Sequence, residues 1–148
     1  FYLPMPTVRK TVLLGYPAER MFALVERIED YPRFLPWCGE ARVLERTPEG
    51  MVATIVIAYR GLNQSFTTEN THRPPHSIVM RLREGPFSTL TGEWRFVALA
   101  PDACRVEFEL DYAFGNALVA RLVGPVFDQI AATFVDAFVR RAEQTLDG

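Results

Sequence analysis

The chain has few cysteines, almost no lysine and no excess of charge of either sign. Its 148 residues include two cysteines, and only Lys10 among the 16 basic residues is a lysine. Cys38 and Cys104 match no metal-ligating or redox spacing, so we expect two small buried side chains in a reducing compartment. Because the formal net charge is −2, no broad basic field is available to hold nucleic acid, and we expect no DNA partner.

Long hydrophobic runs are also missing. No stretch of 18 consecutive apolar residues occurs and no signal segment opens the sequence, which predicts a cytoplasmic protein without a transmembrane helix, at most peripheral to the inner membrane. Met5 and Pro6 resemble a natural start, so we interpret residues 1–4 as an upstream extension or an expression remnant. Length and a hydrophobic content of 49% predict one globular domain over residues 6–146.

Hydrophobic periodicity predicts a strand followed by a helix at the beginning of this domain. Alternation favours a strand at residues 7–14, and apolar residues at helical spacing favour a helix at 17–28. Residues 29–39 contain Pro32 and Pro36 beside several aromatic side chains. This segment is too rich in proline for a long helix and too aromatic for a solvated loop, so we expect a short helix that packs on its neighbours.

From residue 41 onward the hydrophobic period is two, and turn signals recur, which predicts six further antiparallel strands. The strand at 104–114 is the clearest, with Glu107, Glu109 and Asp111 on its wet face, where their pKa values have no reason to shift. We expect Arg95 to pair across strands with one of these glutamates. The turn signals lie at residues 47–50, 60–63, 73–76, 84–86 and 100–102.

A long helix is predicted after Asn116, which is a good N-cap, and it extends to about residue 146. Gly124-Pro125 interrupts it, so we expect a kink or two segments there. A helix this apolar on one side needs a concave partner, and the sheet is the only one on offer. The predicted fold is therefore α+β, a helix-grip in which a curved antiparallel sheet wraps around the C-terminal helix. The apolar row on this helix is Leu118, Leu122, Val126, Ile130, Phe134, Phe138 and Ala142.

Few residues in the sequence offer chemistry. His72 and His76 flank a predicted turn, and since no nearby carboxylate would orient them, we interpret them as exposed turn histidines. No phosphate-binding loop, nucleophile elbow or metal-ligand cluster occurs. We therefore predict no catalytic residue and no metal site. The inward polar candidates form a poor acid–base set and are Thr68, Asn70, Cys104 and Tyr112.

A curved sheet around one helix can leave an apolar cavity near its open end, although the same side chains can also form a solid core. Periodicity does not decide between these alternatives. We expect Phe134 to face the sheet across the cavity, and Tyr59 and Asn70 to be the polar groups near its mouth. The predicted ligand-binding residues are Phe34, Leu35, Trp37, Tyr59, Phe66, Met80, Leu82, Phe87, Trp94, Phe96, Phe108, Leu110, Tyr112, Val126, Phe127, Ile130 and Phe134.

One segment carries a family resemblance. Residues 31–38 read Tyr-Pro-Arg-Phe-Leu-Pro-Trp-Cys and resemble the Tyr-Pro-x-Phe-Leu-Pro-x-Cys signature of the coenzyme Q-binding START-like family, within the SRPBCC or polyketide cyclase-like superfamily. Its bacterial branch includes ribosome-association toxins of the RatA type. Residues 85–96, 104–116 and 137–142 resemble other motifs of this family, so the likeness spans nearly the whole chain. Two departures are Pro17, where a serine cap is common, and Trp37, where the toxin branch tends to have glycine.

The resemblance implies a helix-grip domain that binds a lipid or polyketide-like ligand, without catalysis and without a required cofactor. The leading hypothesis is a protein that binds ubiquinone and supports respiratory electron transport. The alternative is a toxin that binds the large ribosomal subunit and blocks subunit joining. Its basic contact would be Arg81 and Arg83, or Arg140 and Arg141. A polyketide cyclase-like enzyme is the third hypothesis.

The composition of residues 31–38 also predicts where this segment lies. Phe34, Leu35 and Trp37 are too apolar to face water in a soluble monomer. We predict a lid or wall at the cavity mouth, which transient contact with a membrane surface could accompany. The alternative is that the segment only plugs the edge of the sheet.

Overall fold

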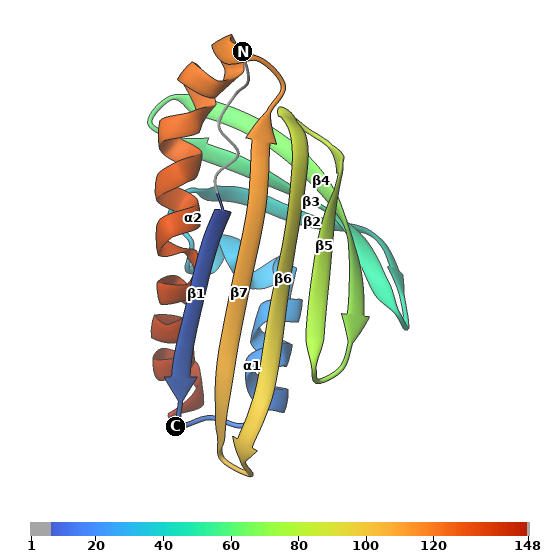
Figure 1. Ribbon diagram of the computed structural model, residues 1–148, viewed down its shortest axis with the longest axis vertical. Helices are drawn as coiled ribbons and strands as arrows, with labels where there is room; N and C mark the ends of the chain where they lie inside the picture. The colour runs from blue at the N-terminus through green and yellow to red at the C-terminus, as the bar shows by residue number, and fades with distance from the viewer. Residues whose placement is uncertain (1–6, 148) are drawn as a thin grey trace.

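The computed structural model describes residues 7–147, which form a seven-stranded sheet, two α-helices and a 3₁₀ helix (Figure 1). The predicted order of elements is confirmed. The start of the domain at Pro6 and the extension at residues 1–4 lie outside the described residues. The elements are β1 (Thr7–Leu14), α1 (Ala18–Glu26), the 3₁₀ helix η1 (Ile28–Arg33), β2 (Cys38–Thr47), β3 (Gly50–Tyr59), β4 (Leu62–Arg73), β5 (Ser77–Glu84), β6 (Phe87–Ala100), β7 (Ala103–Phe114) and α2 (Ala117–Leu146).

All neighbouring strands are antiparallel, in the order β1-β7-β6-β5-β4-β3-β2, so β1 and β2 are the two edges. Figure 1 shows α2 along one side of the sheet, while β2, β3 and β4 cross obliquely to β1, β7 and β6. α1 contacts β6, β7 and α2, and η1 contacts the edge strand β2. The sheet thus curves around the helices, which confirms the predicted α+β helix-grip fold.

The first helix is short because a 3₁₀ helix that contains a proline follows it directly. Met21, Phe22 and Val25 are buried on one face of α1, which begins after Pro17. The predicted helix at 17–28 ends earlier, since the chain tightens into η1 after Arg27. Pro32 inside η1 has no N–H to donate, which disfavours continuation as an α-helix.

α2 is one continuous helix with Pro125 inside it, so of the two alternatives expected at this point, a kink or two segments, the second is wrong. As predicted, Asn116 caps it, because its side-chain oxygen accepts a hydrogen bond from the Val119 N–H at 2.9 Å. Leu118 and Leu122 are more than 60% exposed, contrary to the predicted apolar row. Successive residues spaced by four are rotated about 40° around the helix axis. A row with this spacing therefore winds around the helix, and its N-terminal members point away from the sheet.

α2 is long and apolar enough to cross a membrane, judged by length and composition alone, and its most apolar part has a mean hydropathy of 1.4. The core helices of soluble domains have the same two properties. Phe127, Ile130 and Phe138 are buried among the residues that pack on the sheet. We therefore interpret α2 as the core helix of the domain.

The inner face of the sheet forms the core. Alternate residues of β6 and β7 are buried, as predicted, including Trp94, Phe96, Phe108 and Leu110. Cys104 belongs to the same face, and Cys38 is also buried, which confirms the structural interpretation of both cysteines. Burial raises the pKa of the Cys38 thiol to about 11, so this group stays a protonated apolar filler.

Candidate functional site: a small cavity under the sheet

A cavity of about 60 Å³ lies between the inner face of the sheet, the end of α1 and the middle of α2. Its wall is mostly apolar, with a polar stretch supplied by α1 and β4. The lining residues are Val25, Glu26, Ile28, Tyr31, Trp37, Met51, Ile55, Phe66, Thr68, Asn70, His72, Ile78, Met80, Leu90, Phe108, Leu110, Phe127, Ile130, Ala131 and Phe134.

The predicted ligand-binding residues divide into three groups, and their binding of a ligand stays a prediction. Those that line the cavity are Trp37, Phe66, Met80, Phe108, Leu110, Phe127, Ile130 and Phe134. Those buried in the core away from the cavity are Leu35, Phe87, Trp94, Phe96 and Tyr112. Those only partly buried at the edge of the core are Phe34, Tyr59, Leu82 and Val126.

The second and third groups lie away from the cavity because other side chains already fill the space beside them. Phe87 packs against Phe127 with ring centroids 4.8 Å apart, and Trp94 packs against Phe138 at 5.2 Å. Tyr59 lies at the end of β3 and carries the Arg60 guanidinium over its ring at 5.1 Å. The structure therefore contradicts the expectation that Tyr59 lies at the cavity.

Phe134 faces the sheet, as predicted, and narrows the cavity. Its ring lies 5.6 Å from that of Phe108, 5.7 Å from Trp94 and 6.1 Å from Trp37. Stacked and tilted aromatic rings fill volume efficiently. At about 60 Å³ the cavity is smaller than the roughly 150 Å³ that admits benzene in an engineered core. A quinone ring therefore requires the surrounding side chains to move.

The segment from Tyr31 to Cys38 forms one wall of the cavity through Tyr31 and Trp37. The Tyr31 hydroxyl donates a hydrogen bond of 2.5 Å to the Val25 carbonyl, and burial raises its pKa far above the usual range. The Trp37 carbonyl accepts from the Ala58 N–H at 2.8 Å, which ties the segment to β3. Because Tyr31 and Trp37 line the cavity, the segment is one of its walls and does not only plug the sheet edge. Whether it acts as a lid stays a prediction.

His72 corrects the sequence interpretation. It is buried in β4, with 7% of its surface exposed, and its Nδ1 lies 3.3 Å from Oε2 of Glu26. Glu26 comes from the last turn of α1, about 46 residues earlier in the sequence, which local reasoning about a turn histidine could not reveal. A signal was available, however, because His72 continues the inward alternation of Phe66, Thr68 and Asn70. His76 is exposed, as predicted.

The polar stretch of the wall is partly satisfied within itself. The Thr68 hydroxyl donates a hydrogen bond of 2.8 Å to Oδ1 of Asn70, and both residues are buried. Within residues 7–147, two buried polar atoms have no hydrogen-bond partner, Nε2 of His72 and Nε1 of Trp94. No group of metal-ligating side chains occurs in this described part of the chain.

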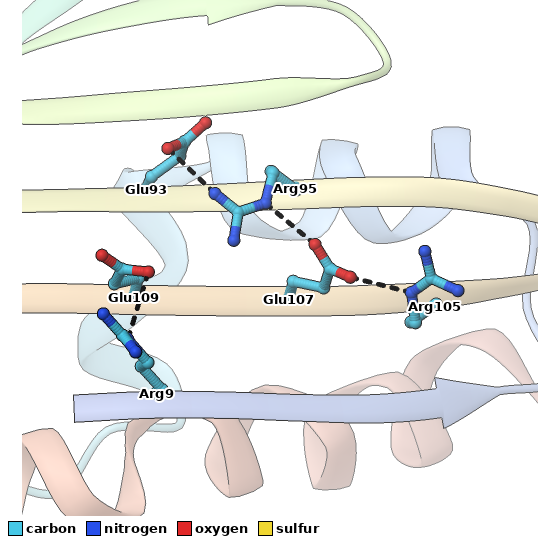
Figure 2. Close-up of polar contacts among 6 residues, drawn as sticks. All are labelled: Arg9, Glu93, Arg95, Arg105, Glu107 and Glu109. Atoms are coloured by element: carbon cyan, nitrogen blue, oxygen red, sulfur yellow. Dashed lines mark hydrogen bonds and ion pairs between the residues drawn. The ribbon is translucent and has the colours of Figure 1, made fainter.

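The outer face of β6 and β7 carries a row of alternating charges (Figure 2). As predicted, Arg95 pairs across strands with Glu107 at 2.9 Å; it also contacts Glu93 at 3.0 Å, and Glu107 accepts from Arg105 at 2.8 Å. The hydrogen bond from Arg95, followed by that from Arg105, lowers the pKa of Glu107. The expectation of an unshifted carboxylate is wrong for Glu107, because two guanidinium groups converge on it.

Comparison with known proteins adds three findings. The family model described as "Polyketide cyclase / dehydrase and lipid transport" matches residues 14–139. The "Ribosome association toxin RatA" of Escherichia coli (strain K12) is 43% identical over 140 residues, which cover 95% of this chain and 89% of the relative. The mitochondrial "Coenzyme Q-binding protein COQ10" of Drosophila melanogaster is 26% identical over 139 residues, or 91% of this chain and 57% of the relative.

Among solved structures, the "Zhui aromatase/cyclase" of a Streptomyces species superposes with a TM-score of 0.83 at 18% identity, over 97% of this chain and 96% of that one. At this identity the likeness supports the fold alone. The relatives found by sequence thus carry the names of a ribosome association toxin and a coenzyme Q-binding protein.

Proposed function

This chain belongs to the polyketide cyclase / dehydrase and lipid transport family, and on that premise we propose that it is a cytoplasmic ribosome-associating protein of the toxin type. The observation that carries the proposal is the 43% identity, over 95% of the chain, to a protein named as a ribosome association toxin. The coenzyme Q-binding relative is more distant, at 26%. The relatives therefore favour the second hypothesis drawn from the sequence over the first.

The outer face of β5 offers the charge that such an association needs. Arg81 and Arg83 are exposed, and within residues 7–147 neither has an ion-pair partner. On β6 and β7, Arg95 and Arg105 are instead held by glutamates (Figure 2). A guanidinium group that is not already paired can bind an RNA phosphate and release a counterion. We therefore place the ribosome contact on β5.

The other basic candidates lie on the last turns of α2. Arg141 lies over the Phe34 ring, 5.1 Å from its centroid, and is only partly exposed, while Arg140 is exposed. A guanidinium that stacks on a buried aromatic cluster has part of its surface covered by that ring. This pair is therefore the weaker candidate for contact with phosphate.

The test is binding of purified large ribosomal subunits at several KCl concentrations. For Arg81→Gln/Arg83→Gln we expect a several-fold weaker affinity, and the slope of log affinity against log salt should fall by about 1.4 to 1.8, since each of the two lost phosphate contacts removes roughly 0.7 to 0.9. The matched control is Arg27→Gln/Arg33→Gln, which removes the same number of positive charges from two arginines that both pair with Asp30. Equal losses in both variants would remove the contact from β5, and a wild type that does not bind would refute the function.

Ubiquinone binding is the second candidate function, supported by the apolar cavity and by the COQ10 likeness. Trp37 lines the cavity and Trp94 does not. A quinone head group quenches indole emission at short range, so ubiquinone should dim wild type and Trp94→Phe, whereas Trp37→Phe should lose most of the quenching. Emission that does not change saturably in the wild type would exclude this candidate.

We infer that the protein acts by binding rather than by cyclising a polyketide. A cyclase has to hold a folded chain of many atoms beside its acid–base groups, and pockets for molecules of drug size measure about 300–1,000 Å³. The cavity of about 60 Å³ would have to enlarge about fivefold or more to hold such a chain. Incubation with an aromatic polyketide precursor should leave its rate of ring closure unchanged, and acceleration by wild type would contradict the inference.

A further inference from the structure

His72 lies in the cavity wall, where burial of its polar imidazole ring costs free energy. Its side chain is 95% buried, its backbone N–H donates a hydrogen bond of 2.7 Å to the Glu49 carbonyl, and the Phe22 ring packs edge-on against the imidazole with centroids 6.1 Å apart. The ring therefore has a fixed position. A buried imidazole nitrogen without a partner loses its hydration and gains nothing in return.

The contact with Glu26 determines which nitrogen carries the proton. Glu26 Oε2 lies 3.3 Å from Nδ1, and a carboxylate oxygen in this position accepts a hydrogen bond from an imidazole N–H. Nδ1 is therefore the protonated nitrogen of the neutral ring. Nε2 then carries a lone pair, and this is the atom that has no partner in the described part of the chain. Burial lowers the pKa of His72, which agrees with a neutral ring.

We propose that Nε2 of His72, oriented by Glu26, is the acceptor of a recognition site for the hydroxyl group of an aromatic or enolic ligand that enters the cavity. The lone pair requires a hydrogen-bond donor. A cationic donor would lose its hydration against a wall made mostly of apolar side chains, whereas a phenolic hydroxyl is neutral. The rings of Phe66, Phe108 and Phe127 in the same wall offer aromatic faces and edges for a planar ligand.

Asn70 adds a second polar position to the site. It lies two residues before His72 on β4, so both side chains point to the same face of the sheet. Because Oδ1 of Asn70 already accepts from Thr68, its Nδ2 amide is the group left to donate to a ligand. The wall thus presents one acceptor and one donor side by side. A ring that carries a hydroxyl group and a carbonyl or ether oxygen matches this pair.

The cavity has to enlarge to admit such a ring, and its wall contains side chains able to move. Met80 is only partly buried, and its Cε lies over Gly92 beside Leu110, in space that a side chain at position 92 would otherwise fill. Unbranched methionine changes rotamer at low cost. The site is separate from the arginines of β5, so it does not rest on the proposed ribosome association.

The test compares 4-fluorophenol with fluorobenzene, which lacks the hydroxyl, by ¹⁹F NMR titration. Wild type should bind the phenol about tenfold more tightly, because a buried acceptor gains a hydrogen bond from one ligand only. His72→Leu should bind the two compounds equally. His76→Leu, the same substitution at the exposed histidine, should behave as wild type. Equal affinities in the wild type would overturn the proposal and indicate that water alone occupies the site.

A second readout uses the wild type only, so it does not depend on whether His72→Leu folds. ¹⁵N NMR of the His72 imidazole should show a protonated Nδ1 and an unprotonated Nε2, and the Nε2 resonance should move when 4-fluorophenol is added. A protonated Nε2, or a resonance that the phenol leaves in place, would refute the assignment. Neither result depends on whether the protein binds ribosomes.

Discussion

The two faces of the sheet use charged and polar residues in opposite ways. On the inner face, Glu26 and His72 meet in a wall of apolar side chains, and one nitrogen of the pair is left without a partner. On the outer face, Glu107 sits between Arg95 and Arg105 in solvent, and each of its carboxylate oxygens has its own guanidinium (Figure 2). The inner pair therefore lacks a hydrogen-bond partner for Nε2 of His72, whereas both carboxylate oxygens of Glu107 on the outer face have one.

The contrast between the two faces indicates which of these groups serve a function rather than stability. Exposed ion pairs contribute little to stability, because water and salt screen them. A buried and unsatisfied group costs free energy, and a fold retains it at low cost only when a ligand or water supplies the missing partner. The inner face is therefore where we expect a ligand, and the unpaired arginines of β5 on the outer face are where we expect a macromolecule.

The largest expected effect comes from placing a charge on the inner side of α2. Phe134→Asp puts a carboxylate among Trp94 and Phe108 and should lower the free energy of unfolding by about 3 kcal/mol or more. Leu122→Asp, on the same helix but 62% exposed, should change it by less than about 0.5 kcal/mol. Urea unfolding measures both. Similar losses in the two variants would mean that the helix does not have an inner and an outer side.

The inner pair should make stability depend on pH. Burial lowers the pKa of His72, against an opposing attraction from Glu26, while Arg46, itself paired with Glu29, also lowers it. The unfolded state then binds more protons, so stability should fall as the pH drops below about 6.5, by at most roughly 1.4 kcal/mol per pH unit, and should be level above it.

Urea midpoints of wild type and His72→Leu at several values between pH 5 and pH 8 measure this dependence. His72→Leu should flatten the curve in the acidic part of this range, relative to His76→Leu, which keeps the buried histidine. Parallel curves for the two variants would show that the inner pair does not respond to pH in the expected way.

A smaller effect is expected where the inner face meets solvent at the edge of α2. The Tyr112 hydroxyl donates a hydrogen bond of 2.5 Å to Asp128, and burial together with this bond raises the pKa of Tyr112. Tyr112→Phe keeps the ring and removes the hydrogen bond, so it should cost about 1 kcal/mol. Thermal unfolding measures the loss. An unchanged melting temperature would indicate that this bond, like the exposed ion pairs of the outer face, contributes little to stability.

The smallest effect is expected on the outer face itself. Arg95→Ala breaks the contacts with Glu93 and Glu107 and should cost about 0.2–1 kcal/mol, with less cost at high salt. Unfolding at 0.05 M and 1 M NaCl tests both statements. A loss of several kcal/mol that persists in salt would show that the outer row is a structural element and would remove the contrast between the faces.

The fold was accessible from the sequence wherever a strict period exists. Alternation along 104–114 and the cap at Asn116 predicted β7 and the start of α2, because both depend on residues close in the sequence. The apolar row through Leu118 and Leu122 was misplaced, since spacing alone does not say how far the sheet extends along the helix.

The candidate site was less accessible because it depends on contacts between distant residues. Side chains such as Phe108 and Ile130 were placed correctly in the cavity wall, because hydrophobic periodicity indicates which face of a strand or helix is buried. The partnership of Glu26 with His72 joins α1 to β4, and no periodicity predicts which elements meet at that depth. The volume left between aromatic rings depends on their rotamers, which the sequence does not specify.

If the cavity and the arginines of β5 are two separate functional surfaces, one titration distinguishes them. The affinity for purified large ribosomal subunits is measured for wild type, for Arg81→Gln/Arg83→Gln and for His72→Leu in the same buffer. Wild type and His72→Leu should bind equally, and the arginine variant should bind several-fold more weakly. Weaker binding by His72→Leu, with the arginine variant unchanged, would show that the ribosome contact does not lie on β5.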